Sequence, residues 1–163
     1  MLGQLTSSFG ARRDPFTLAD SLHPGLDVDV DLGAPVHVTA DGVVAEAGYH
    51  PEYGNVVTVS HGFGIQTRYA HLQRFVVRQG TSVRRGQVVG HAGSTGRSTG
   101  THLHYEVWLR GKRINPVGAK VPQGTVLTGR ELAAFKVQKA RVDAMLAAEA
   151  GTQYAARGQT PRG

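Results

Sequence analysis

The chain has 163 residues, of which 40% are apolar and 18% are charged, so it has the size and composition of one ordinary folded domain. Glycine is unusually common, with 22 residues, and cysteine is absent. The lack of cysteine excludes disulfides, thiolate metal ligands and cysteine nucleophiles. No apolar run approaches the roughly 20 residues that span a membrane, and the first residues do not form a secretory signal.

Charge is distributed unevenly along the chain, whose formal net charge is +6. Residues 1–60 carry eight acidic and two basic side chains, whereas residues 61–163 carry sixteen basic and four acidic ones. A basic protein of this kind can bind a polyanion, but a solvated basic surface that only aids solubility explains the charge equally well. Charge alone therefore leaves the partner open.

The first 25 residues are predicted to be irregular, because turn signals occur at Asp14-Pro15 and His23-Pro24-Gly25. From Leu26 to about Leu109, short segments bounded by Gly, Pro, Asn or Asp predict strands. The predicted strands cover residues 26–30, 35–39, 42–47, 55–60, 64–70, 87–92 and 103–109. Short strands separated by glycine turns indicate a mainly β fold, with antiparallel sheets in a sandwich or barrel-like arrangement.

The C-terminal part has a different pattern. Thr128-x-x-Glu131 is a capping box, and the apolar residues that follow it recur at helical spacing. We therefore expect a domain over residues 1–127, a helix over 128–150 that packs on the domain or on a partner, and a flexible tail over 151–163.

The first chemical signal is His23-Pro24-Gly25-Leu26-Asp27. A histidine and an aspartate four residues apart would share one face of a helix, but Pro24 and Gly25 argue against a helix. A turn leading into a strand must instead bring the two side chains together.

Three further histidines lie at the ends of predicted strands. His71 ends one strand, and His102 and His104 open another, on which residues two apart point to the same face. Two imidazoles and a carboxylate form a common catalytic zinc set that leaves a fourth position for water. Additional imidazoles can take a proton from that water and stabilise an oxyanion. Each fragment alone also fits a structural histidine or a turn-capping aspartate, and that interpretation is favoured for any single fragment.

A series of motifs between about Ser7 and about Pro116 favours a metal site over the structural interpretation of each fragment. They are Ser8-Phe9-Gly10-x-Arg12-x-x-Pro15-Phe16, His23-x-Gly25-x-Asp27, Gly33-x-Pro35-Val36, Gly54-Asn55-x-Val57-x-Val59-x-His61-Gly62, Tyr69-Ala70-His71-Leu72, Val83-x-x-Gly86-Gln87-x-x-Gly90, Gly93-Ser94-Thr95-Gly96 with Ser98-Thr99-Gly100, and His102-Leu103-His104-Tyr105-Glu106. In this order and spacing, they resemble the lysostaphin/LytM-type zinc metallopeptidases, which cleave peptidoglycan peptides. So many ordered motifs argue against chance similarity.

The resemblance implies a role for each of the five histidine and aspartate residues. His23, Asp27 and His104 look like the ligands of one Zn²⁺ ion, and His71 and His102 look like the catalytic pair. The fold that it implies is a barrel-sandwich-like LytM peptidase domain of antiparallel sheets with a groove, followed by one C-terminal helix.

Five further residues are candidates for the substrate groove. Arg12 and Asn55 match family positions near the site, although both could be structural. Ser94 and Thr95 belong to a glycine-rich loop that resembles one wall of the groove, and His50 lies in a predicted loop that could overhang it.

The implied function is a zinc-dependent endopeptidase that cleaves stem peptides or cross-links of bacterial peptidoglycan. The helix after the core is similar to that of Gram-negative envelope enzymes, which favours D-Ala–diaminopimelate cross-links. The alternative is a non-catalytic wall-binding module or an activator of a separate amidase, and the complete catalytic pair argues against it. A nucleic-acid partner would need base-reading or stacking residues, which the sequence does not indicate.

The resemblance also implies a location. A peptidoglycan hydrolase must meet its substrate in the cell envelope, in the periplasm or outside the cell. We therefore expect that a signal or anchor segment is missing from this sequence. We also expect that it lacks an upstream regulatory segment of the kind that blocks the groove in relatives.

Overall fold

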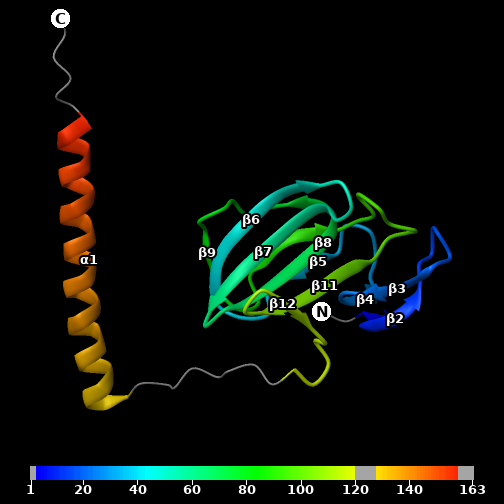
Figure 1. Ribbon diagram of the computed structural model, residues 1–163, viewed down its shortest axis with the longest axis horizontal. Helices are drawn as coiled ribbons and strands as arrows, with labels where there is room; N and C mark the ends of the chain where they lie inside the picture. The colour runs from blue at the N-terminus through cyan, green and yellow to red at the C-terminus, as the bar shows by residue number, and fades with distance from the viewer. Residues whose placement is uncertain (1–2, 120–127, 158–163) are drawn as a thin grey trace, which may run out of the picture. The chain divides into compact units, whose positions relative to one another are not determined.

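The computed structural model describes residues 3–119 and 128–157. It divides into two units, Met1–Pro122 and Gln123–Gly163 (Figure 1). The predicted boundary at residue 127 falls in the stretch 120–127, which lies outside the described residues. Within the described residues, no helix combines the length and the hydrophobicity that crossing a membrane requires.

The first unit consists of a ten-stranded sheet and a two-stranded sheet in which every pairing is antiparallel. The strands are β1 (Gln4–Ser7), β2 (Gly10–Arg13), β3 (Asp20–His23), β4 (Leu26–Asp29), β5 (Pro35–His37), β6 (Gly42–His50), β7 (Gly54–Gly62), β8 (Ile65–Phe75), β9 (Ser82–Val83), β10 (Val88–Ala92), β11 (Leu103–Leu109) and β12 (Lys112–Ile114). The main path of the large sheet is β1-β4-β11-β8-β7-β6-β9. Strands β2 and β3 form the small sheet.

The mainly β, antiparallel class predicted from the sequence is confirmed, but the prediction for the first 25 residues is wrong. This region forms β1, β2 and β3. Strand β1 pairs with β4, about 20 residues away in sequence, and the β2–β3 hairpin is closed by a turn around Asp14, whose Oδ1 accepts the Phe16 and Thr17 N–H groups. Turn residues marked the turns correctly, but they do not show that the segments between them pair.

The large sheet continues through side pairings. Strand β10 pairs with both β5 and β8, and β12 pairs with the end of β11. In Figure 1 the long strands β6, β7 and β8 run side by side, with β11 next to β8. The short strands β9 and β12 were not predicted, because two or three residues carry no readable alternation.

The core lies within this unit and is built mostly of valine. Continuous runs of buried residues occur in β7 and β8, where Val57, Val59, Tyr69 and Leu72 pack with Leu103 at the start of β11. The buried Tyr69 hydroxyl accepts the Thr39 backbone N–H at 2.9 Å, so the one polar atom of this large side chain is satisfied. This packing fixes β8 and β11, the two strands that carry histidines of the candidate site.

The second unit contains helix α1 (Gly129–Arg157). It begins where the capping box predicts, and the Glu131 N–H donates to the Thr128 carbonyl at 3.2 Å. The helix continues past the predicted end at residue 150 to Arg157, through a stretch in which Gly151 is the one residue of very low helix propensity. The remaining tail, residues 158–163, lies outside the described residues.

Candidate metal centre and active site

Asp27 and His104 are brought together by strand pairing. Strand β4 pairs with β11, and Asp27 lies directly opposite His104 in the register. Side chains in such a pair stand about 5 Å apart on one face of the sheet. The register therefore places a carboxylate and an imidazole next to each other in the structure, although 77 residues separate them in the chain.

His23 reaches the same place from the other sheet. It is the last residue of β3, and the chain turns through Pro24 and Gly25 into β4. A Cβ atom at Gly25 would lie 2.5 Å from the Tyr105 carbonyl oxygen and 2.9 Å from His104 Cε1. Glycine is needed here because only a residue without a side chain lets the turn lie against the His104 ring.

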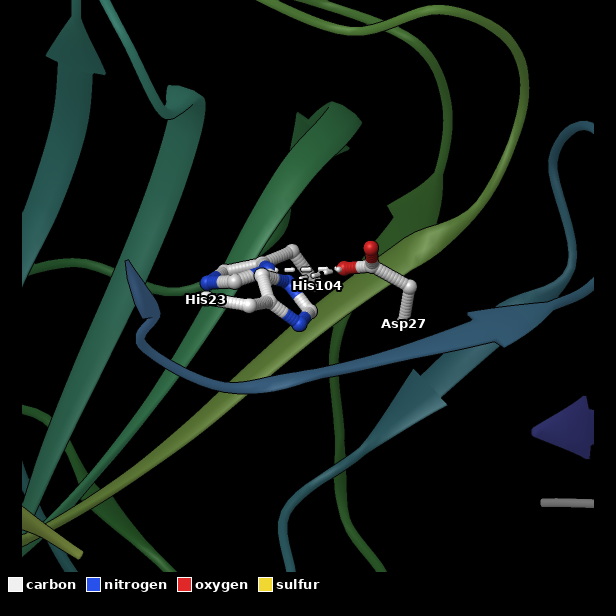
Figure 2. A group of neighbouring side chains, drawn as sticks. All are labelled: His23, Asp27 and His104. Carbon is white, nitrogen blue, oxygen red and sulfur yellow. Dashed lines mark hydrogen bonds and ion pairs between the residues drawn. The ribbon is translucent and has the colours of Figure 1, made fainter. Parts of the chain in front are cut away.

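The three side chains form a compact, buried cluster, which Figure 2 shows in close-up. Asp27 Oδ1 lies 2.8 Å from His104 Nδ1 and 3.1 Å from His23 Nε2, and the two ring nitrogens are 3.3 Å apart. The exposed fractions are 3% for His23, 8% for Asp27 and 4% for His104. Such burial of polar groups needs a compensating partner.

The donor set fits a zinc ion. His23 Nδ1 lies 2.9 Å from the Ser8 carbonyl, to which it donates, so in the neutral ring Nε2 carries a lone pair. His104 Nε2 lies 3.2 Å from Glu106 Oε1, which leaves a lone pair on Nδ1 in the same way. Two nitrogen lone pairs and one carboxylate oxygen thus converge, and only a cation or protons can hold them together. Two nitrogens and an oxygen are ligands that Zn²⁺ accepts in open, catalytic sites.

The charge state of the cluster also favours binding of a cation. When protons take the place of a cation, burial by itself would raise the pKa of Asp27, but hydrogen bonds from His104 and His23 outweigh the effect of burial and hold that pKa well below its usual value. Burial would lower the pKa of His104, but its hydrogen bonds to Asp27 and Glu106 raise it. Asp27 is therefore ionised, and the cluster attracts positive charge.

His71 lies inside β8 rather than at the end of a strand, because β8 runs on to Phe75. Its φ is +58°, a conformation that is uncommon for a residue with a side chain, and the register with β7 shifts at the same place. The irregularity turns His71 toward the cluster, and its ring centroid is 5.8 Å from that of His104.

His71 and His102 form a second pair of rings, with centroids 4.8 Å apart. His71 Nδ1 donates to the Thr95 carbonyl at 2.8 Å, and His102 Nδ1 donates to the Gly100 carbonyl at 2.8 Å. The Nε2 atom of each neutral ring is then an acceptor. His102 Nε2 lies 3.7 Å from Asp27 Oδ1, so this pair lies next to the His23, Asp27 and His104 cluster.

His71 is neutral at ordinary pH. Burial, together with the charges of His102 and His104, lowers the pKa of His71 to about 4, against the hydrogen bond to the Thr95 carbonyl. A neutral imidazole beside a metal-binding site can accept a proton from water.

All five residues line one cavity of about 490 Å³. Of the groove candidates, only Arg12 lies in its wall, where it donates to Asp27 Oδ2 at 3.3 Å. The others contact neighbouring chain segments: Asn55 Nδ2 donates to the Leu72 and Gln73 carbonyls, Thr95 Oγ1 donates to the Leu72 carbonyl, Ser94 Oγ donates to Ser98 Oγ, and His50 Nδ1 accepts from the Glu52 N–H. Asn55 and Thr95 thus support the backbone around His71 rather than line the groove.

Several cavity residues were missed by sequence reasoning. Tyr53 and Arg113 line the wall, and Glu106 lies beneath them. On the opposite side, Arg97 pairs with Asp14 at 2.7 Å and lies over the Phe16 ring, so the loop that carries Arg97 contacts the β2–β3 turn. Glu106 belongs to the family motif at residues 102–106, which was the one indication in the sequence that it lies near the site. Nothing in the sequence links Tyr53 or Arg113 to Glu106.

A mainly β fold with a His, Asp, His cluster and two further histidines in one cavity defines a metallopeptidase domain of the lysostaphin type. The model of peptidase family M23 matches residues 21–116, more than half of the chain. The chain therefore belongs to peptidase family M23.

Curated relatives agree with this assignment. The chain is 45% identical over 144 residues to the DD-carboxypeptidase/endopeptidase Mpg of Neisseria meningitidis serogroup B, covering 88% of this chain and 33% of that protein. It is 40% identical over 145 residues to the peptidoglycan DD-endopeptidase ShyA of Vibrio cholerae, covering 88% and 34%. The chain thus spans about a third of the length of these relatives.

Solved structures share the fold. A zinc-containing peptidase from Vibrio cholerae matches with a TM-score of 0.69 and 40% identity, over 74% of this chain and 37% of the other. The catalytic domain of lysostaphin from Staphylococcus simulans matches with a TM-score of 0.64 and 27% identity, over 71% and 90%. The first unit is therefore comparable with an almost complete lysostaphin catalytic domain.

Proposed function

We propose that this domain is a zinc-dependent endopeptidase that hydrolyses amide bonds in peptidoglycan peptides, at D-Ala–diaminopimelate cross-links. The observation that carries the proposal is the convergence of His23, Asp27, His71, His102 and His104 on one cavity, with one nitrogen of each ring held by a partner outside the cluster. The names of the relatives, DD-endopeptidases of peptidoglycan, support the substrate class.

The five site residues have two different roles in the proposed hydrolysis, metal binding and proton transfer. His23, Asp27 and His104 would hold the ion, which when bound would act as a Lewis acid toward the substrate carbonyl and lower the pKa of water. His71 and His102 have acceptor Nε2 atoms, so the pair takes one proton from the attacking water as its oxygen adds to the carbonyl carbon. The proton then passes to the amide nitrogen, the C–N bond breaks, and an amine and a carboxylate are released.

The same pair can stabilise the transition state. Once one imidazole of the pair is protonated, its N–H can donate to the oxyanion of the tetrahedral intermediate. The ring contact of 4.8 Å keeps both imidazoles close to a single reacting carbonyl. No covalent intermediate is needed, because water is the nucleophile.

The proposal places the protein in the cell envelope, where cross-linked peptidoglycan is found. The cavity wall contains Arg12, Arg97 and Arg113, and each of these side chains is paired with a carboxylate of the domain itself.

The test uses a defined cross-linked muropeptide and mass spectrometry of the products. We expect the zinc-loaded protein to release new amine ends and a chelator to stop the release. His102→Ala should lower the rate by about 10²- to 10⁴-fold, because one proton-transfer group is lost. His37→Ala is the matched control, since His37 only contacts the Gly86 carbonyl on another part of the sheet, and it should keep the wild-type rate.

Two results would contradict the proposal. One is equal product release with and without the chelator, and the other is full activity of His102→Ala. Sedimentation with intact peptidoglycan without any new amine ends would instead identify a wall-binding module or an activator of another enzyme.

A further inference from the structure

Glu106 is the most completely buried acidic side chain near the cavity, with an exposed fraction of 0%. It lies on β11 two residues after His104, so both side chains point to the same face. A carboxylate in such a place is costly unless its oxygens are fully hydrogen-bonded. Its partners therefore show what the fold uses it for.

Two neighbouring side chains can act only as hydrogen-bond donors to Glu106. Trp108 Nε1, which carries a hydrogen and no lone pair, lies 2.7 Å from Oε2. The Tyr53 hydroxyl lies 2.9 Å from Oε1, and it accepts a hydrogen bond from Arg113 at 2.9 Å. Arginine has no acceptor, so the hydroxyl proton of Tyr53 must point to Glu106.

Two cations complete the surroundings. Arg113 Nε lies 3.5 Å from Oε1, and Arg68 Nη1 lies 3.9 Å from Oε2. Donors and positive charges on every side keep Glu106 ionised and acceptor-only. The remaining contact, between Oε1 and His104 Nε2 at 3.2 Å, is then a hydrogen bond that His104 donates.

We propose that Glu106 is the positioning residue of the metal centre: by accepting the Nε2–H of His104, it fixes the tautomer that leaves the Nδ1 lone pair facing Asp27 and His23. The inference deepens the proposed function, because it assumes that the His23, Asp27 and His104 cluster binds the ion. Neighbouring groups that accept a hydrogen bond from a ligating histidine commonly set its tautomer and its affinity for metal.

The alternative tautomer would compete with the metal. Without an acceptor at Nε2, neutral His104 can carry its proton on Nδ1 and donate it to Asp27 Oδ1, which is only 2.8 Å away. That hydrogen bond would occupy both ligand atoms at once. Removing the acceptor should therefore weaken zinc binding without removing any ligand.

The experiment compares Glu106→Gln with Trp108→Phe. Glu106→Gln removes the negative charge and leaves one amide oxygen for the three donors Trp108, Tyr53 and His104, so the Nε2–H of His104 has a weaker acceptor that is no longer fixed in place. Trp108→Phe removes a donor to the same carboxylate but leaves the contact with His104 intact. Both variants disturb the packing around Glu106, so the control accounts for structural damage.

Two readouts are needed. The zinc dissociation constant is measured by competition with a chelating dye, and the proton position on His104 is measured by ¹⁵N–¹H correlation of the ring in metal-free protein at alkaline pH. We expect Glu106→Gln to raise the dissociation constant by about 10- to 100-fold and Trp108→Phe to leave it near the wild-type value. The His104 ring should be the Nε2–H tautomer in wild type and a mixture in Glu106→Gln.

The inference is overturned if Glu106→Gln and Trp108→Phe bind zinc equally well, or if His104 of the wild type carries its proton on Nδ1. The second measurement needs no variant, so it decides the matter even if Glu106→Gln does not fold. Wild-type protein that binds no zinc would refute the proposed function itself, whereas the tautomer measurement on that protein would still test Glu106.

Discussion

His71 occupies a backbone conformation that costs energy, and its neighbours supply the compensation. A non-glycine residue with φ of +58° carries a penalty of about 1–3 kcal/mol. The His71 N–H donates to the Tyr53 carbonyl at 2.8 Å, and its ring donates to the Thr95 carbonyl. The strain is held at a residue that faces the cavity, which is where strained backbone is usually found.

The lowered pKa of His71 predicts a pH dependence. Its folded-state pKa of about 4 is below the ordinary 6.5, so between these values the unfolded chain binds more protons than the folded one. The contribution of His71 to stability is therefore complete above pH 6.5 and is lost as the pH falls toward 4. An NMR titration of metal-free protein should give a midpoint near 4 for the His71 ring.

A midpoint near the ordinary value would show that burial does not control His71. The stability difference between wild type and His71→Gln, followed by urea unfolding across the same pH range, provides an independent check. We expect wild-type stability to fall more steeply with acid than that of the variant, which lacks the titrating ring.

Gly25→Ala tests the close approach of the turn to His104. The new methyl group would meet the Tyr105 carbonyl oxygen at 2.5 Å and the His104 ring at 2.9 Å, so the turn or the ring must shift. We expect zinc affinity to fall by at least about 10-fold, because displacing one ligand costs more than 1.4 kcal/mol. Gly48→Ala, where an added methyl group meets nothing within 4 Å, should bind zinc like wild type.

At the scale of elements, the loop after β10 determines the geometry of β8. Thr95 Oγ1 donates to the Leu72 carbonyl at 2.7 Å and accepts the Asn55 N–H at 2.9 Å. The loop also approaches β7 closely, since a Cβ atom at Gly54 would lie 2.3 Å from Thr95. One threonine thus joins β7, β8 and the loop at the point where the register shifts.

Thr95→Val should therefore weaken both stability and catalysis. It leaves the Asn55 backbone N–H without its acceptor, which costs about 1–3 kcal/mol, whereas the Leu72 carbonyl keeps the hydrogen bond from Asn55 Nδ2. Thermal unfolding should show the loss, and the rate on the muropeptide should fall because the Thr95 carbonyl also holds His71. Ser94→Ala in the same loop, whose hydroxyl contacts Ser98 Oγ, should change neither quantity appreciably.

The sequence predicted the elements whose pattern is local. Alternating apolar residues and glycine turns located the strands from β4 to β11, apart from the short β9. It failed for β1, β2 and β3, because their apolar residues are few and their pairing depends on partners elsewhere. Likewise, the family motifs identified the five histidine and aspartate residues that the structure brings together.

What the motifs could not supply is the direction in which a side chain points. Asn55 and Thr95 are in motifs near the site, yet both turn to backbone carbonyls of β8. Tyr53 and Arg113 belong to no motif, yet they meet at Glu106, because β12 folds back on β11 and the chain before β7 lies beside them. Such contacts follow from the register of the sheet and not from residue type.

At the scale of the whole molecule, the site and the core belong to one unit. Among the described residues, the buried core residues and the residues that line the cavity lie within Met1–Pro122. The second unit contributes helix α1 and none of these residues.

A fragment of residues 1–122 should therefore fold alone and keep its zinc affinity. Its thermal midpoint should lie within a few degrees of that of the full chain, because a difference of 1 kcal/mol shifts the midpoint of a domain this size by about 4 °C. Circular dichroism and dye competition measure the two quantities. An unfolded fragment, or one that has lost its metal, would show that the helix is part of the folded core.

The position of His23 on the small sheet has a consequence for when activity arises. Strands β2 and β3 pair only with each other, whereas Asp27 and His104 lie on the large sheet. A chain whose hairpin has not yet docked offers two ligands instead of three, and two hold zinc weakly. Under the proposed function, a complete zinc site would therefore form only after the β2–β3 hairpin has docked and His23 has joined Asp27 and His104.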